Sequence, residues 1–229
     1  MPFDPFGDFA TRGYLRNTAG ETDPGRVRRL EHGAFSDNVV AALDSLRAVP
    51  QLRYEHVLQT NRVLFGDLYP CAGQDRAALA PSLAIGKAGR YDLFAHPGDV
   101  RRAVEYGLDM ARDPASLRSR SGEVFGTLAY AHPFLETNGR TLMTVHADLS
   151  RRAGFHIDWQ SIGKGEFLAA LTEELRKPGT ALDRLLAPHI LPGPQPLHTT
   201  AAKLAANPGL NPPDAANPPS GPQPGPRPQ

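Results

Sequence analysis

The sequence has one cysteine, no long hydrophobic run and almost no net charge. Cys71 alone cannot form an internal disulfide or a cysteine-rich zinc site, which suits a reducing compartment. No apolar stretch approaches the roughly 20 residues of a membrane-spanning helix, and the N-terminus lacks a signal-peptide pattern. With 25 basic and 24 acidic residues, no broad attraction to nucleic acid or to a membrane surface is expected. We therefore expect a cytoplasmic protein, while export as an effector by a specialised machine would leave no such mark.

Proline is unevenly distributed, because twelve of the 23 prolines lie in residues 192–229. From residue 191 onward the chain has few bulky apolar side chains, so folding could not offset its ordering entropy. We predict a disordered Pro-rich tail over 191–229 and a flexible Pro- and Gly-containing lead-in over 1–22. A single domain over 23–190 remains, which is long enough to bury a sizeable core.

Apolar residues recur at helical spacing along most of this domain. The predicted helices cover residues 24–46, 52–65, 97–112, 123–130, 167–176 and 182–186, and one more runs from the Asn138-Gly139 turn to Gly154. Residues 83–94 contain a Gly-Lys-Ala-Gly turn between two short apolar pieces, which predicts a small β-hairpin. Because no other segment carries a strand pattern, the predicted fold class is all-α.

A nine-residue stretch between two of the predicted helices gathers the groups that carry chemistry. They are His132, Glu136, Asn138, Gly139 and Arg140. The second helix is expected to start at the Asn-Gly turn, and a helix N-terminus offers unbonded N–H groups and a favourable dipole to an anion. The pattern therefore predicts a loop that holds a phosphate beside a base.

Together with Phe134, these residues resemble the signature loop of the Fic family, His-x-Phe-x-(Asp/Glu)-Gly-Asn-Gly-Arg-x-x-Arg. Residues 64–76 resemble the family's Phe-Gly-Asp-(Ile/Val)-Tyr-x-x-Ala-Gly-x-x-Arg block, and residues 14–17 resemble a common lead-in. The hairpin at 83–94 lies where the family carries its flap. The resemblance covers about residues 14–187 and implies a Fic-type helical bundle with a small β-hairpin flap.

The resemblance further implies a nucleotidyltransferase that moves AMP from ATP to a Ser, Thr or Tyr hydroxyl of a target protein. His132 would accept the proton of that hydroxyl, and Glu136 would hold Mg²⁺ against the phosphates. The implied phosphate-binding residues are Thr137, Asn138, Gly139 and Arg140. The implied target-binding flap consists of Ile85, Gly86, Lys87, Ala88 and Gly89, which would align an extended segment by strand addition.

Two residues depart from the family signature. Thr137 replaces a glycine, and a β-branched residue resists a positive φ. Met143 replaces the second arginine, so the terminal phosphates lose a partner. These departures leave two alternatives open: a catalytically weak or inactive binding or regulatory module, and a transferase that uses another donor such as UTP or CDP-choline. Gly139 argues against the phosphorylating relatives, which have Lys there.

Many relatives carry an inhibitory motif, Ser/Thr-x-x-x-Glu-(Gly/Asn), on a helix that approaches the second arginine. We find no such motif in this sequence. Its absence indicates either no autoinhibition or inhibition by a separate, antitoxin-type chain.

Overall fold

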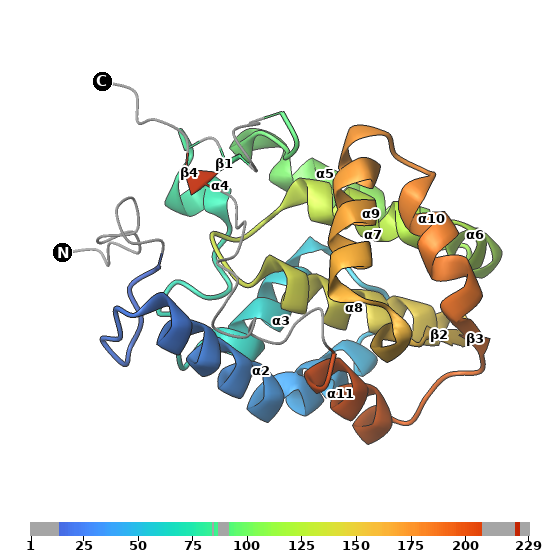
Figure 1. Ribbon diagram of the computed structural model, residues 1–229, viewed down its shortest axis with the longest axis horizontal. Coiled ribbons are helices and arrows are strands. Elements are labelled where there is room, and N and C mark those ends of the chain that lie inside the picture. The colour runs from blue at the N-terminus through green and yellow to red at the C-terminus, as the bar shows by residue number, and fades with distance from the viewer. Residues whose placement is uncertain (1–13, 84, 87–91, 208–222, 225–229) are drawn as a thin grey trace.

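The computed structural model describes residues 14–83, 85–86, 92–207 and 223–224, and it is mostly helical (Figure 1). The α-helices in this part of the chain are α2 (Pro24–Arg47), α3 (Tyr54–Phe65), α4 (Arg76–Leu79), α5 (Val100–Met110), α6 (Pro114–Ser119), α7 (Ser121–Ala131), α8 (Asn138–Arg152), α9 (Lys164–Arg176), α10 (Ala181–Leu186) and α11 (Leu197–Ala205). Short 3₁₀ helices are η1 (Pro97–Asp99), η2 (Trp159–Ser161) and η3 (Ala187–His189). The all-α prediction is confirmed.

Helix α2 begins where the sequence places a capping residue and a first-turn proline. The Asp23 side chain accepts a hydrogen bond from the Arg26 backbone N–H at 2.8 Å, and Pro24 occupies the first turn. The helix continues through Gly33, which faces open space, so this glycine weakens the helix by about 1 kcal/mol without breaking it. One long helix therefore forms.

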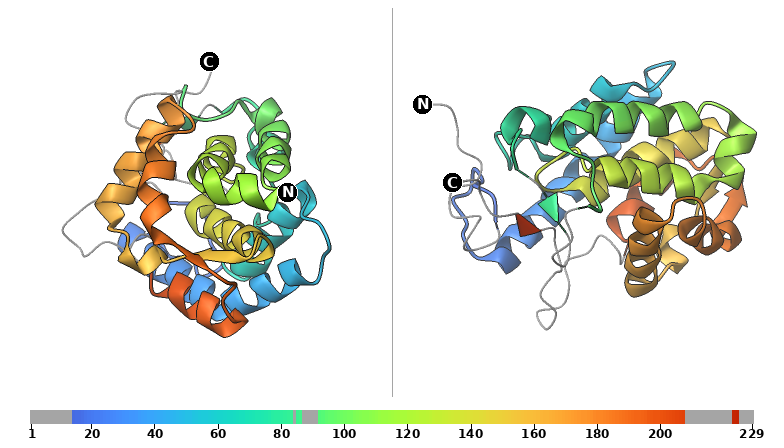
Figure 2. Two further views of the ribbon diagram at one scale, coloured as in Figure 1. Left: turned by 90° about the vertical axis from the view of Figure 1, so that its right-hand side faces the viewer. Right: turned by 90° about the horizontal axis from the view of Figure 1, so that it is seen from above.

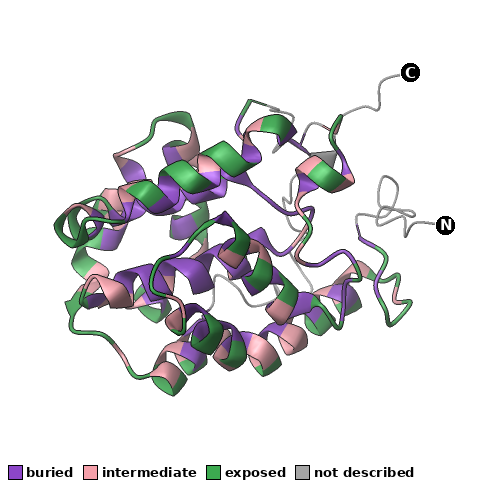
Figure 3. Cartoon of the chain, turned by 180° about the vertical axis from the view of Figure 1, so that it is seen from behind, coloured by how far each residue is buried: buried purple, intermediate pink, exposed green. Residues whose placement is uncertain are grey.

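Helices α7 and α8 lie at the centre of the bundle (Figure 2). Helix α7 packs on α5, α9 and α10, while α8 packs on α2 and α3. Nearly all residues of α7 and α8 are buried or half-buried, whereas the outer helices turn exposed residues outward (Figure 3). The loop between α7 and α8 is thus held between two well-packed helices, which fixes its position.

Two short antiparallel strand pairs accompany the helices. Strand β2 (Phe155–Ile157) pairs with β3 (Ile190–Pro192), and β1 (Ile85–Gly86) pairs with β4 (Gln223–Pro224). The prediction of no strand outside the hairpin is wrong for β2, β3 and β4. These strands have two or three residues each, too few to show a strand period, and their partners lie far away along the chain. Much of the predicted hairpin, residues 84 and 87–91, lies outside the described residues.

The packed chain extends past the predicted tail boundary at residue 191. Helix α11 lies within the predicted tail and packs on α2, where Ala201 and Leu204 are buried. Two apolar side chains one helical turn apart suffice there, because α2 and α8 already provide the core that they cover. The boundary is therefore corrected to residue 207 for the described chain. Residues 208–222 and 225–229 lie outside the described residues.

The predicted lead-in is described from residue 14, and this part packs against the domain. Tyr14 and Leu15 are buried in the core cluster. The Thr18 backbone N–H donates to the Leu68 carbonyl at 2.9 Å. Residues 14–18 therefore belong to the folded unit. Across the described residues, no helix is long and apolar enough to cross a membrane.

Candidate functional site

The loop between α7 and α8 is bounded by two residues with left-handed backbone. His132 ends α7 with φ 42°, and Thr137 precedes α8 with φ 66°. These are the two non-glycine residues of positive φ in the described part of the chain. Such conformations cost about 1–3 kcal/mol each and persist where surrounding contacts enforce them. The six-residue turn from His132 to Thr137 therefore has a shape that its neighbours impose.

Arg76 holds the His132 end of the loop. Its guanidinium is buried and donates to the carbonyl of His132 at 2.7 Å and to those of Ala95 and Ala131. Its own backbone N–H donates to the Pro133 carbonyl at 2.8 Å. Burial lowers the pKa of Arg76 to about 10, so the side chain stays cationic at neutral pH, which suits the carbonyl end of a helix.

His132 lies at the first position of the loop, and it is not among the residues that line the neighbouring pocket. The side chain is mostly buried, and its ring packs against Phe94 with the ring centroids 4.3 Å apart. The backbone bond from Arg76 fixes the residue from the other side. The ring contact with Phe94 and the bond to the backbone carbonyl together hold His132 at the start of the loop.

Asn138 closes the loop with its side chain. Its Oδ1 accepts from the Phe134 N–H at 2.9 Å, and its Nδ2 donates to the Phe134 carbonyl at 2.7 Å. The first intrahelical hydrogen bond of α8 runs from the Thr141 N–H to the Thr137 carbonyl. The backbone N–H groups of Asn138, Gly139 and Arg140 come before it, as at any helix start. The sequence thus located the helix N-terminus, but not the role of the Asn138 side chain in closing the turn.

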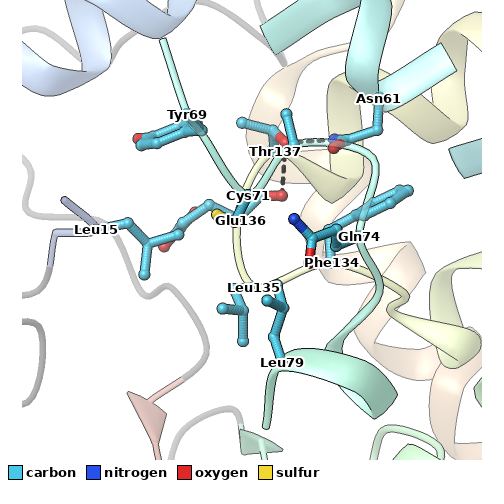
Figure 4. A pocket seen from close by; sticks show the side chains of 11 residues that line it. Leu15, Asn61, Tyr69, Cys71, Gln74, Leu79, Phe134, Leu135, Glu136 and Thr137 are labelled. Atoms are coloured by element: carbon cyan, nitrogen blue, oxygen red, sulfur yellow. Dashed lines mark hydrogen bonds between the residues drawn. The ribbon is translucent and has the colours of Figure 1, made fainter. Parts of the chain in front are cut away.

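Thr137 adopts the positive φ that the sequence departure made questionable. Its hydroxyl donates to the Glu136 carbonyl at 2.5 Å and accepts from Nδ2 of Asn61 at 2.9 Å (Figure 4). Asn61 lies on α3 and was not identified from the sequence. Its distance of 76 positions from Thr137 leaves no local pattern by which the pair could have been found.

Charged side chains converge beside the loop from α2 and α8. The Arg140 guanidinium pairs with the Glu31 carboxylate at 3.0 Å, and the Tyr69 hydroxyl donates to the other oxygen of that carboxylate at 2.7 Å. Burial, and then the charge of Glu31, raise the pKa of Glu136 to about 8. Glu136 therefore takes up a proton more readily than a solvent-exposed glutamate, and a bound cation would favour its carboxylate form.

A pocket lies on the Glu136 side of the loop (Figure 4). Its lining comes from the lead-in, from the segment between α3 and α4, and from the loop itself, and it includes Leu15, Cys71 and Glu136. Burial raises the pKa of the Cys71 thiol, so this cysteine is a neutral wall residue and not a nucleophile.

Met143 is buried where the family signature has its second arginine. Its sulfur lies 3.8 Å from Nδ2 of Asn207, which follows α11. The segment of α11 and Asn207 thereby covers this side of α8, and the uncharged Met143 side chain, which accepts from the Asn207 amide, occupies the position of the missing guanidinium. The folded segment beyond residue 191 therefore contacts α8 at Met143, the position of the missing arginine.

The next basic residues of α8 after Met143 are His146, Arg151 and Arg152, and the side chains of all three are engaged away from the loop. His146 is fully buried in an aromatic cluster, and burial lowers its pKa to about 4. Both arginines pair with the buried Asp148, at 2.8 Å and 2.6 Å. None of the three supplies a charge to the loop.

The predicted flap is described in part. Ile85 and Gly86 form β1, whose partner is β4 near the C-terminus. Lys87, Ala88 and Gly89 lie outside the described residues. The sequence did not anticipate that the C-terminal segment pairs with this strand.

Residues 51–149 match the sequence model of the Fic/DOC family. The protein adenylyltransferase VbhT of Bartonella schoenbuchensis is 30% identical over 178 residues, which cover 74% of this chain and 35% of that protein. This chain thus spans about a third of that relative. The probable protein adenylyltransferase y4lH of Sinorhizobium fredii is 28% identical over 166 residues, covering 69% of this chain and 81% of the relative.

Solved Fic domains share the fold. The VirB-translocated effector BepC of Bartonella tribocorum, solved with bound AMPPNP, aligns with a TM-score of 0.62 and 20% identity over 78% of this chain and 92% of that one. The N-terminal Fic domain of a VirB-translocated effector from Bartonella quintana, solved with bound ADP, gives 0.62 and 20% over 81% of this chain and 94% of that one.

Proposed function

This chain belongs to the Fic/DOC family, and from that premise we propose that it transfers AMP from ATP to a hydroxyl side chain of a target protein. One observation carries the proposal. The turn between α7 and α8 brings His132, Glu136, Arg140 and the N-terminus of α8 together on a loop of fixed shape. The names of the two curated relatives support the same activity.

In the proposed reaction, the neutral imidazole of His132 accepts the proton of the target hydroxyl as its oxygen attacks the α-phosphorus. The new bond joins that oxygen to phosphorus, and the bond to the β-phosphate oxygen breaks and releases pyrophosphate. The N–H groups at the start of α8 and the Arg140 guanidinium stabilise the negative charge on the phosphates. Arg140 would then exchange its present partner Glu31 for a phosphate oxygen, or share itself between them.

The residues fit a magnesium ion held together with a nucleotide. Among the described residues, no group of three His, Cys, Asp or Glu side chains could form a cage for a metal ion. A single carboxylate is what Mg²⁺ uses when phosphates and water complete its shell, and Glu136 is that carboxylate next to the helix start. When bound, Mg²⁺ would supply charge neutralisation at the phosphates.

Two further parts of the proposal come from the sequence alone. The flap residues Ile85–Gly89 would align an extended target segment, and a separate inhibitory chain would regulate the enzyme. The effector names of the solved relatives support a role outside the producing cell.

A second candidate function is a catalytically weak module that binds without turning over. The buried Met143 and the engagement of Arg140 by Glu31 favour it, because both reduce the positive charge offered to ATP.

Mass spectrometry separates the two candidates. The purified chain is incubated with ATP, Mg²⁺ and a lysate, and proteins are searched for the mass of an added adenylyl group on Ser, Thr or Tyr. The proposal expects adenylylated residues with the wild-type chain and none with His132→Ala. Their absence with the wild type would refute adenylyl transfer, and parallel reactions with UTP and CDP-choline would show whether another donor is used.

A further inference from the structure

The amide of Asn61 makes hydrogen bonds with both its nitrogen and its oxygen, and these bonds connect the loop, α8 and the turn at Gly73. Its Nδ2 donates to the hydroxyls of Thr137 at 2.9 Å and Thr141 at 3.1 Å, and its Oδ1 accepts from the Gly73 N–H at 2.8 Å. Only 2% of Asn61 is exposed. A buried amide with all of these bonds made is rigid, because any rotation would leave polar atoms unsatisfied.

Thr137 needs such a neighbour. A β-branched side chain at φ 66° crowds its own backbone, and a free Thr would leave this conformation. The two bonds of the hydroxyl, one donated to the Glu136 carbonyl and one accepted from Asn61, fix the rotamer and with it the backbone. A glycine at this position would adopt the same φ without help.

Asn61 also fixes the opposite wall of the pocket. Gly73 has φ 81°, and a Cβ there would lie 2.7 Å from Cβ of Arg62, so this backbone approaches α3 closely. The bond from the Gly73 N–H to Asn61 holds the turn between two pocket residues, Cys71 and Gln74. The Asn61 side chain on α3 is thus bonded to both walls of the pocket, and Figure 4 shows its bond to Thr137.

We propose that Asn61 is a positioning residue for the phosphate-binding loop, which acts by holding Thr137 in the left-handed conformation at the start of α8. Asn61 and Thr137 together do what a glycine does alone. Without the bond from Asn61, Thr137 relaxes and turns the N–H groups of Asn138 and Gly139 away from the phosphates. This inference rests on the proposed function for its ligand, but not for the coupling between Asn61 and Thr137.

The first experiment compares two isosteric substitutions that each remove one acceptor of the same Asn61 amide. Thr137→Val deletes the acceptor in the loop, and Thr141→Val deletes the acceptor within α8. ATP affinity with Mg²⁺ is measured by calorimetry, and amide exchange of residues 136–141 is measured by mass spectrometry. We expect roughly tenfold weaker ATP binding and faster loop exchange for Thr137→Val, with less than a twofold change for Thr141→Val. Equal effects of the two variants would assign Asn61 a purely structural role.

The second experiment tests coupling by rescue. Asn61→Ala alone is expected to weaken ATP binding roughly tenfold and to speed loop exchange. In the double variant with Thr137→Gly, exchange of residues 136–141 is expected to slow again and at least half of the lost affinity, on a logarithmic scale, to return. Additive effects in the double variant would overturn the proposal, since they would mean that Asn61 does not act through Thr137.

The exchange measurement keeps the two proposals distinguishable. If the wild-type chain bound no ATP, the proposed function would fail, while rescue of loop exchange by Thr137→Gly would still support the positioning role of Asn61. If ATP bound normally to Asn61→Ala and loop exchange were unchanged, the positioning role would fail and the proposed function would stand.

Discussion

Glu31 competes with a phosphate for Arg140, so Glu31→Gln is expected to strengthen nucleotide binding. The Glu31 side chain is 9% exposed and pairs with Arg140 at 3.0 Å. A carboxylate about 7 Å from a phosphate charge, at an effective dielectric constant of about 20, repels it by about 2 kcal/mol. Removing that charge should lower the dissociation constant of ATP roughly 30-fold. It should also lower the pKa of Glu136, because the charge of Glu31 helps to raise it.

The assay is a calorimetric titration of ATP with Mg²⁺ at two salt concentrations. Glutamine keeps an acceptor for the Tyr69 hydroxyl, so the variant is expected to stay folded. Tyr69→Phe is the matched control, since it removes the other partner of Glu31 and leaves the charge in place. Its affinity should change by less than about threefold. Unchanged or weaker ATP binding by a folded Glu31→Gln variant would refute the reasoning.

Three further predictions concern stability. Gly122→Ala would place a Cβ 2.2 Å from the backbone nitrogen of Asp183, so we expect the free energy of unfolding in urea to fall by about 2–3 kcal/mol. Gly33→Ala, whose Cβ meets open space, should instead raise it by about 0.5–1 kcal/mol. Similar urea midpoints for the two variants would contradict the packing of α7 on α10. Asp148→Ala leaves two arginines without their buried carboxylate and should cost about 3 kcal/mol in the same assay, a prediction that an unshifted midpoint would disprove. The folded pKa of Glu136 is raised to about 8, so its stabilising contribution is present below the unfolded pKa of about 4.5 and is lost as pH rises through 8. The melting temperature of the wild type should therefore fall more between pH 5 and pH 8 than that of Glu136→Gln. Parallel pH profiles of the two melting temperatures would count against the raised pKa.

The site could be located from the sequence because its parts are close together along the chain. His132 through Arg140 occupy one turn between two helices, and both helices show apolar periodicity that the structure confirms. The start of α2 can be predicted for the same reason, since the capping residue Asp23 and the proline after it act within one helical turn. Local chemistry of this kind needs no knowledge of the fold.

What the sequence could not reveal depends on contacts between distant segments. Glu31 meets Arg140 across 109 positions, and Asn61 meets Thr137 across 76. Strands β2 and β3 are separated along the chain by α9 and α10, and α11 has few apolar residues because it covers a core built by α2 and α8. In each case the residue type does not predict the contact, because the partner is brought close only by the tertiary structure.

The most direct test of the central claim is to follow the two ends of ATP separately. Wild-type chain and His132→Ala are incubated with Mg²⁺, a lysate and ATP labelled either at the α- or at the γ-phosphate, and protein-bound label is measured. Attack at the α-phosphorus assisted by His132 predicts protein labelling from α-labelled ATP with the wild type alone, and none from γ-labelled ATP above the level with His132→Ala. Wild-type-dependent labelling from the γ-phosphate, or equal α-labelling by both chains, would contradict the account.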